Sequence, residues 1–223
     1  MICNNIATLR RQIPENVKLV CVSKFHSAEN IMDAYRAGER IFGESRVQEL
    51  TAKQPQLPAD IQWHFIGHLQ TNKVKYLIPC VSLIHSVDSI ELLVEINRQS
   101  AKNKKITDIL LQVHIAREET KFGFLPSEIL NFFKTDDWRK FMNVRICGLM
   151  GMATYTDDNA QIISEFQTLA ELFKIIKTEY LSADNSFCEL SMGMTDDFPL
   201  AIAAGGTMLR IGGAIFGERK IVV

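Results

Sequence analysis

Residues 18–44, KLVCVSKFHSAENIMDAYRAGERIFGE, contain the pattern that decides the fold class. The stretch begins with an apolar run at 18–24 and ends with a second one at 40–44, and both runs are typical of buried β-strands. Between them, residues 28–38 form a helical stretch. A strand, a helix and a second strand in this order are the unit from which parallel sheets are built.

The same alternation continues to the end of the chain. In the helical stretch at 89–103, Ile90, Leu93 and Val94 stand at positions i, i+3 and i+4, as a helix that covers a sheet requires. Six further strands are expected, at 63–67, 83–87, 108–115, 144–151, 187–193 and 207–217. The other helical stretches lie at 45–53, 71–78, 126–134, 159–181 and 196–205.

Eight strands, with a helix after nearly every one, predict an α/β fold of one particular kind. No linker or change of composition divides the chain, so we expect one domain over residues 1–223, folded as a closed (β/α)8 TIM barrel. An open, doubly wound sheet is the alternative.

Composition excludes several classes of partner. The chain has 25 basic and 26 acidic residues and a net charge of −1, so no overall basic field attracts nucleic acid or an anionic membrane. No apolar run approaches the length of about 18 residues that spans a bilayer. The N-terminus lacks the basic-then-apolar order of a signal peptide. We therefore expect a cytoplasmic protein.

Five cysteines give no sign of a disulfide framework or a zinc site. Their number is odd, and their spacing matches no CxxC or Cys/His ligand pattern. The pattern predicts buried thiols in a reducing compartment. They are Cys3, Cys21, Cys80, Cys147 and Cys188.

Lys24 ends the first apolar strand. In a TIM barrel the active face is the carboxyl end of the strands. By strand alternation Lys24 shares a face with Val20 and Val22, and if these two line the interior, Lys24 enters the mouth. A partly desolvated lysine has a lowered pKa, and its neutral amine can attack an aldehyde to form an imine. The alternative is a solvated lysine at a strand end.

Two glycine-containing turns follow the last two strands. In ELSMGMTDDF (189–198) we expect Thr195 to be the N-cap of a helix that has Asp196 and Asp197 in its first turn. Free amides there, and in RIGGAIFG (210–217), favour an anion, and loops after strands seven and eight are the usual phosphate cradle of this fold. Alternatively, the hydroxyl side chains only cap a helix and the glycines only turn the chain.

Arg210 interrupts an otherwise apolar strand. It lies on the face opposite to Leu209 and Ile211. A desolvated guanidinium is costly without an acceptor. Either it forms an internal ion pair with Glu44 or Glu189, or its acceptor belongs to a ligand.

Other catalytic arrangements are absent from the sequence. His64 lies on a buried strand, where a histidine is usually a satisfied core residue, and no Ser or Cys nucleophile accompanies it. Paired acids for glycoside hydrolysis and a Walker-type lysine loop are also absent.

Four segments together resemble one family, the pyridoxal phosphate homeostasis proteins, also called the YggS or PROSC family. The first is LVCVSKFHSAENIMDAYRAGERIFGESRVQEL (19–50), and the second is WHFIGHLQTNKVK (63–75). They are followed by GLMGMAT (148–154) and LSMGMTDDFPLAIAAGGTMLRIGGAIFGER (190–219). The combination is far more specific than any one segment, and the resemblance covers essentially the whole chain.

The resemblance implies an alanine racemase-like barrel of the fold-type III class, without that class's C-terminal β domain. Such a barrel binds pyridoxal 5'-phosphate (PLP), a form of vitamin B6, as a Schiff base. By position, the resemblance implies that Lys24 is the Schiff-base lysine and that Arg210 faces the pyridine nitrogen. It also implies two phosphate loops, the first formed by Ser191, Met194 and Thr195 and the second by Gly212 and Gly213. Three further residues are implied to lie near the pocket: His64, Asn72 and Met150.

The chain departs from the family pattern in three respects. Ser45 and Arg46 stand where the family often has Asn-Tyr, which removes one possible contact to the cofactor. Thr195 replaces a frequent serine and keeps the hydroxyl. Gly213 stands where threonine or serine is common, so one side-chain contact to the phosphate is lost.

The implied function is intracellular homeostasis of PLP: its storage, buffering or delivery, with apo forms of PLP enzymes as recipients. A permanently charged Arg210 keeps the pyridine nitrogen unprotonated and a poor electron sink, which suits a carrier, or at most a weak racemase.

Two other functions remain open. One is a PLP-dependent amino-acid racemase or decarboxylase. Relatives with those activities have a further β-rich domain, whereas this chain continues past its last strand only as IFGERKIVV (215–223), which favours a monomeric carrier without enzymatic activity. The other is a cofactor-free class I aldolase that uses Lys24.

Overall fold

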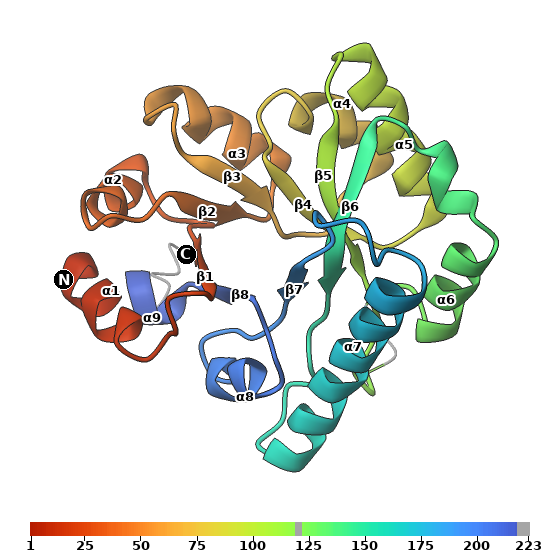
Figure 1. The fold of residues 1–223 in the computed structure, drawn as a ribbon. Helices are drawn as coiled ribbons and strands as arrows, with labels where there is room; N and C mark the ends of the chain where they lie inside the picture. The colour runs from red at the N-terminus through yellow and green to blue at the C-terminus, as the bar shows by residue number, and fades with distance from the viewer. Residues whose placement is uncertain (119–121, 218–223) are drawn as a thin grey trace.

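The strands form one closed parallel barrel (Figure 1). The computed structural model describes residues 1–118 and 122–217; the rest of the predicted C-terminal tail, residues 218–223, lies outside the described residues. The strands are β1 (Lys18–Val22), β2 (Ile41–Glu44), β3 (Gln62–Phe65), β4 (Leu83–Val87), β5 (Thr107–Gln112), β6 (Val144–Met150), β7 (Glu189–Ser191) and β8 (Met208–Ile211).

Closure depends on the pairing between the first and last strands. β8 runs parallel to β1, with Cys21 opposite Ile211 and Val20 opposite Arg210. In Figure 1 the blue β8 therefore lies beside the red β1. This confirms the predicted (β/α)8 barrel, and the open doubly wound sheet is wrong, because an open sheet would leave these two strands as unpaired edges.

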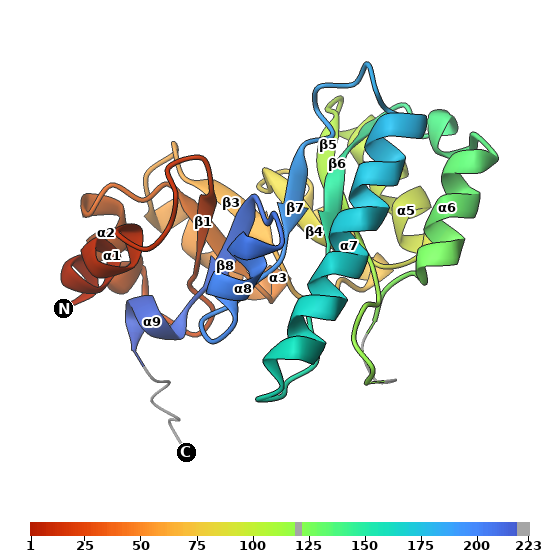
Figure 2. The ribbon, with the colours of Figure 1, turned by 60° about the horizontal axis from the view of Figure 1, so that its bottom comes forward.

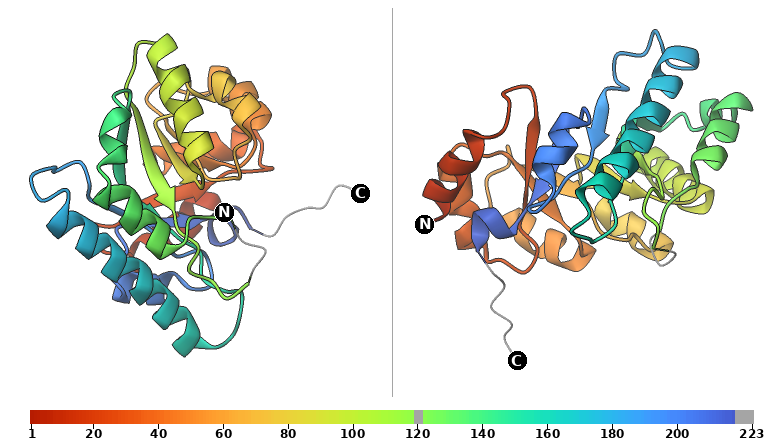
Figure 3. Two further views of the ribbon diagram at one scale, coloured as in Figure 1. Left: turned by 90° about the vertical axis from the view of Figure 1, so that its right-hand side faces the viewer. Right: turned by 90° about the horizontal axis from the view of Figure 1, so that it is seen from below.

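Helices surround the barrel, and every predicted helical stretch contains one. The longest, α7, lies along the outside of the sheet (Figures 2 and 3). The α-helices are α1 (Ile2–Arg10), α2 (Ala28–Arg36), α3 (Val47–Lys53), α4 (Val74–Leu77), α5 (Ile90–Lys102), α6 (Pro126–Lys134), α7 (Asn159–Glu179), α8 (Phe198–Ala203) and α9 (Gly213–Phe216). Three short 3-10 helices are η1 (Gln54–Gln56), η2 (Thr71–Lys73) and η3 (Asp137–Lys140).

Side-chain caps fix where several helices begin after the strand ends. The hydroxyl of Ser27 accepts a hydrogen bond from the amide of Asn30 at the start of α2, and Ser89 caps α5 in the same way. Asp158 accepts two amides at the start of α7. Because these caps satisfy amides that the helix itself leaves free, each turn at the barrel mouth has a defined end.

The core has two layers, and the alternation of β1 separates them. Leu19 and Cys21 pack into the large cluster between barrel and helices. Val20 belongs to a smaller cluster inside the barrel, with Cys147 and Met208 among its members. Val20 therefore lines the interior of the barrel, which is the condition under which Lys24, on the same face of β1, was expected to enter the mouth.

Two expectations about local structure are wrong. The strand predicted at 207–217 ends at Ile211, and the residues after Gly212 form α9, which packs beside the unpredicted α1 (Figure 2). Cys3 and Cys188 are exposed rather than buried.

In the described ranges, 1–118 and 122–217, no helix combines the length and apolar character needed to cross a membrane.

Candidate functional site

Lys24 lies just past the end of β1, where the chain turns toward α2. Its side chain is half-buried. The next residue, Phe25, has a φ of +68°, in the left-handed region that side chains other than glycine rarely adopt. Such a backbone needs support from its surroundings.

That support comes from a charged cluster, which we call the Lys53 clamp: Lys53, Glu44 and Glu49. Lys53 Nζ donates to the carbonyl of Ser23 at 2.9 Å, to Glu44 Oε1 at 2.8 Å and to Glu49 Oε1 at 2.6 Å. Glu49 Oε1 also accepts the amide of Phe25 at 2.5 Å, and Glu44 Oε1 accepts the hydroxyl of Ser23 at 2.6 Å. The backbone on both sides of the lysine is thus fixed by three charged side chains from β2 and α3.

Lys53 and Glu44 are the buried members of the clamp, and the single ammonium of Lys53 faces two carboxylates. Burial raises the pKa of Glu44, while hydrogen bonds from Lys53 and Ser23 lower it. Glu44 Oε2 is buried without a hydrogen-bond partner. A buried ion pair of this kind fixes geometry more than it stabilises the fold.

The two glycine turns lie beside each other and beside β1. A Cβ added at Gly212 would stand 3.0 Å from the carbonyl oxygen of Val22, so only glycine allows this approach without a shift. A Cβ added at Gly213 would stand 3.8 Å from Thr195 Oγ1, the hydroxyl of the other turn. The rings of His26 and Phe216 stack with centroids 4.6 Å apart, which joins the turn after Lys24 to α9.

The turn after β7 differs from the expectation. α8 begins at Phe198 with Asp197 as its N-cap, so the prediction that Thr195 caps this helix is wrong. Pro199 occupies the first turn, where its missing N–H costs nothing. Asp197 Oδ1 accepts the amide of Met194 at 2.5 Å, so that amide, expected to be free, is already bonded.

Arg210 lies inside the barrel and is held by neutral acceptors. Its Nη1 donates to Ser191 Oγ at 2.7 Å and its Nη2 to the carbonyl of Gly151 at 2.9 Å. Desolvation lowers the pKa of Arg210 to about 10, and the charge of Asp197 opposes this shift. The guanidinium therefore stays charged at neutral pH.

The ion pair with a carboxylate, one of the two alternatives for Arg210, is not formed with either candidate. Glu44 belongs to the Lys53 clamp. Glu189 pairs with Lys18 at the other end of the barrel, where the strands begin. Alternation along β8 predicted the correct face for Arg210, but it could not say which strands supply the acceptors.

His64 points into the barrel and meets a histidine that sequence reasoning missed. His64 Nδ1 lies 3.0 Å from His85 Nε2, and His85 Nδ1 lies 3.0 Å from Ser191 Oγ. Desolvation lowers the pKa of His64 to about 3 and that of His85 well below its usual value. The alternation of β4 could have placed His85 on the interior face, but LIHSV looked like a plain buried strand.

The remaining candidates lie in different surroundings. Met150 ends β6 and is buried in the interior cluster. Asn72 is exposed in η2 and shares a surface hollow with Glu91 and Glu95 of α5. Arg46, one of the departures from the family pattern, stacks its guanidinium 4.9 Å from the ring centroid of Phe25.

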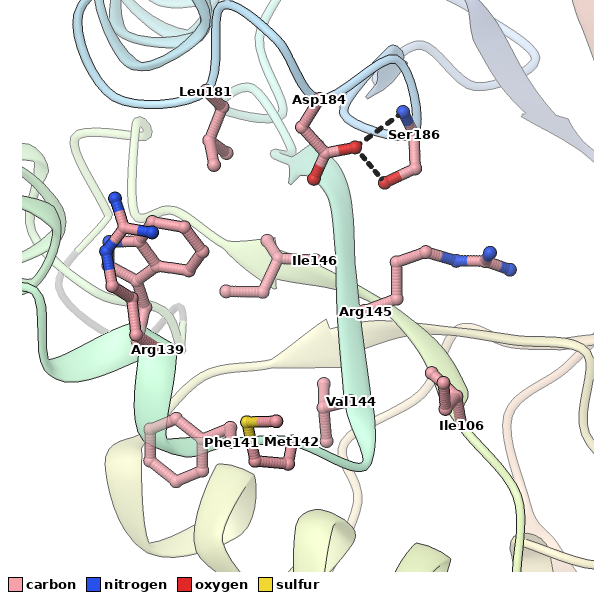
Figure 4. A pocket seen from close by; sticks show the side chains of 11 residues that line it. Ile106, Arg139, Phe141, Met142, Val144, Arg145, Ile146, Leu181, Asp184 and Ser186 are labelled. Atoms are coloured by element: carbon pink, nitrogen blue, oxygen red, sulfur yellow. Dashed lines mark hydrogen bonds between the residues drawn. The ribbon is translucent and has the colours of Figure 1, made fainter.

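Two cavities differ in their relation to these residues. One, of about 520 Å³, lies between the loops that follow β6 and β7, and Thr154, Met194 and Asp197 are among its lining residues. The other, of about 420 Å³, adjoins the start of β6 (Figure 4). Because parallel strands begin at the opposite end, only the first cavity adjoins the turns near Lys24.

Comparison with known proteins gives one consistent result. Residues 1–220 match the family model "Alanine racemase, N-terminal domain". The chain is 41% identical over 204 residues to a pyridoxal phosphate homeostasis protein of Aquifex aeolicus, which covers 91% of this chain and 87% of that protein. A protein of the same name from Haemophilus influenzae is 37% identical, over 92% and 86% of the two chains.

Solved structures agree with the sequence relatives. PipY of Synechococcus elongatus without PLP superposes with a TM-score of 0.91 at 35% identity, over 97% of this chain and 100% of PipY. PipY with PLP bound gives a TM-score of 0.87 at 34% identity, over the same shares. An alanine racemase of Clostridium difficile gives 0.71 at 15% identity, over 99% of this chain and 56% of the racemase, which shows the fold alone.

Proposed function

This chain belongs to the family of pyridoxal phosphate homeostasis proteins, and we propose that it binds PLP in the mouth of the barrel in order to store, buffer or deliver it. The observation on which this depends is the convergence of three turns. The turn with Lys24, the turn with Thr195 and the turn with Gly212 and Gly213 adjoin one another in space. PipY, a relative of the same fold, has a structure with PLP bound.

The residues present fit the chemistry of PLP. When bound, PLP supplies an aldehyde, a phosphate group and a pyridine nitrogen. Lys24 offers a primary amine for the aldehyde. The hydroxyl of Thr195 and the backbone amides around Gly213 are donors for the phosphate. The space at Gly213, where a Cβ would meet nothing closer than Thr195 Oγ1, leaves room for an anion beside both turns.

Arg210 is compatible with a carrier, or at most with a weak racemase. It is charged at neutral pH, can only donate hydrogen bonds, and has its partners in β7, at Ser191, and just past the end of β6, at Gly151. A donor facing a pyridine nitrogen keeps that nitrogen unprotonated, and an unprotonated ring withdraws electrons weakly. The relatives that match over most of their length are named homeostasis proteins, and the racemase shares the fold alone.

We further propose that the recipients of PLP are apo forms of PLP enzymes. The Lys24 turn is half-buried at the carboxyl end of β1, on the face where TIM barrels meet their ligands. A lysine of an acceptor enzyme could compete with Lys24 for the same aldehyde without any other catalytic group.

The test is borohydride reduction of the PLP-loaded protein, followed by peptide mapping. We expect the label on Lys24 in the wild type, and we expect Lys24→Ala to lose both the label and the visible absorbance of PLP. Lys105→Ala is the matched control, because Lys105 is also half-buried and desolvation lowers its pKa, but it lies near the start of β5. A label that maps to a different residue would contradict the proposal, and rapid stereospecific turnover of one amino acid would contradict the carrier function.

A further inference from the structure

A hydrogen-bonded chain of four polar side chains crosses the interior of the barrel. Arg210 Nη1 lies 2.7 Å from Ser191 Oγ, which lies 3.0 Å from His85 Nδ1. His85 Nε2 lies 3.0 Å from His64 Nδ1. The four side chains come from β8, β7, β4 and β3, and none is more than 5% exposed. We call this set the interior chain.

The hydrogen-bond directions in the interior chain follow from its charged end. Arg210 can only donate, so Ser191 Oγ accepts from it. In the described part of the protein, the hydrogen-bond partners of the Ser191 hydroxyl are Arg210 and His85. A fully buried hydroxyl proton without an acceptor is costly, so it points to His85 Nδ1. His85 then carries its proton on Nε2 and donates it to His64 Nδ1.

Both histidines must be neutral for this arrangement. Each Nδ1 has to accept a hydrogen bond, which a doubly protonated imidazole cannot do. Burial is the main cause that lowers the pKa of each histidine, and the cations Arg210 and Lys18, at opposite ends of the pair, also disfavour a further positive charge. The cavity beside His64 also contains Asp108, Arg145 and Glu189, and Glu189 is paired with Lys18.

We propose that His85 is a positioning residue for Arg210. By accepting the proton of Ser191, His85 turns the lone pairs of Oγ toward the guanidinium and fixes its orientation, while His64 fixes the tautomer of His85. This inference rests on the proposed function, because the group that Arg210 would meet is the pyridine nitrogen of PLP. His64, at the end of the interior chain opposite to Arg210, lines a cavity of about 290 Å³ together with Lys18 and Glu189.

Two substitutions of His85 separate positioning from packing. His85→Asn places an amide oxygen near the position of Nδ1 and keeps an acceptor for Ser191. His85→Leu keeps a side chain of similar bulk but removes the acceptor. Leu83→Ala is the matched control, because Leu83 lies two residues earlier on β4 and is buried inside the same barrel.

The first readout needs no cofactor: nitrogen NMR of the imidazole rings in the wild-type protein. We expect both histidines to be neutral, protonated on Nε2, and unchanged between pH 6 and pH 8. A His85 that carries its proton on Nδ1, or either ring gaining a proton within this range, would overturn the inference. This readout remains decisive if His85→Leu does not fold.

The second readout is the pH profile of the absorbance of the PLP-loaded protein. We expect His85→Leu to shift the midpoint of this profile and to weaken PLP binding about tenfold, since Arg210 loses its fixed acceptor. His85→Asn should have the same pH profile as the wild type. Leu83→Ala should lower the stability of the fold but leave the midpoint of the absorbance profile unchanged. A His85→Leu profile identical to the wild type overturns the inference, whereas a wild-type protein that binds no PLP overturns the proposed function instead.

Discussion

At the scale of single residues, the neighbours Gly212 and Gly213 differ in how much space the surrounding atoms leave for a side chain. Gly212 is packed against the carbonyl of Val22, whereas Gly213 faces open space beside Thr195. Both turns were expected from the sequence, but the spacing of two adjacent glycines cannot show which one is required by close packing.

We predict that Gly213→Ser tightens PLP binding about two- to thirteenfold, through one added hydrogen bond worth roughly 0.5–1.5 kcal/mol. The new Cβ would meet Thr195 Oγ1 at 3.8 Å, which is ordinary contact, so stability should not fall. Absorbance titration with PLP measures the change.

Gly212→Ser is the control, because its Cβ would stand 3.0 Å from a backbone oxygen. We expect this variant to bind PLP more weakly than the wild type. Equal affinities for the two variants would mean that the turn after β8 does not contact the phosphate.

At the scale of secondary-structure elements, the Lys53 clamp ties the turn after β1 to β2 and α3. Its members come from segments that sequence reasoning treated as an ordinary strand and helix. The turn between β1 and α2 is therefore held by its neighbours as well as by its own hydrogen bond from the amide of His26 to the carbonyl of Ser23, and Phe25 keeps a left-handed backbone.

We predict that Lys53→Met lowers the free energy of unfolding by about 3–5 kcal/mol, because it leaves the fully buried Glu44 without its counter-charge. Urea unfolding followed by circular dichroism measures this. The same variant should also slow the reaction of Lys24 with PLP, since the carbonyl of Ser23 loses the ammonium donor of Lys53, although it retains the amide of His26.

Lys140→Met provides the comparison, because Lys140 forms an exposed ion pair with Asp137. Such pairs contribute about 0–1 kcal/mol. If Lys53→Met proved as mild as Lys140→Met, the clamp would not support the turn.

At the scale of the whole molecule, the barrel buries two neutral histidines, and its stability should depend on pH. The pKa of His64 in the folded state is about 3, below the unfolded value of 6.5, so the unfolded chain binds the proton first as pH falls. The stabilisation is complete above pH 6.5 and is lost progressively between pH 6.5 and pH 3.

We predict that the free energy of unfolding falls from pH 6 to pH 4 and that His64→Leu makes this fall less steep. One such histidine contributes up to about 1.4 kcal/mol per pH unit. Urea unfolding at several pH values gives the slope, and identical slopes for wild type and variant would show that His64 takes up a proton in the folded barrel.

The sequence predicted the fold in most of its particulars and the site only in part. All eight predicted strands lie where the alternating pattern placed them, and the turns after β1, β7 and β8 adjoin one another at the carboxyl end of the barrel. That these turns form the PLP site stays a prediction. The prediction that strand eight extends to 217 is wrong, since an apolar run cannot distinguish a strand from a short helix such as α9.

The sequence alone determined the barrel, the amine at the end of its first strand and the two glycine turns, because period-two alternation and turn residues act over a few neighbouring positions. Only the tertiary structure decided the partners of these groups. Ser191 and His85 are 106 residues apart in the chain, and Arg210 takes its acceptors from β7 and from just past the end of β6. A buried charge or hydroxyl bonds to whatever the closed barrel brings within 3 Å, and no local pattern specifies that choice.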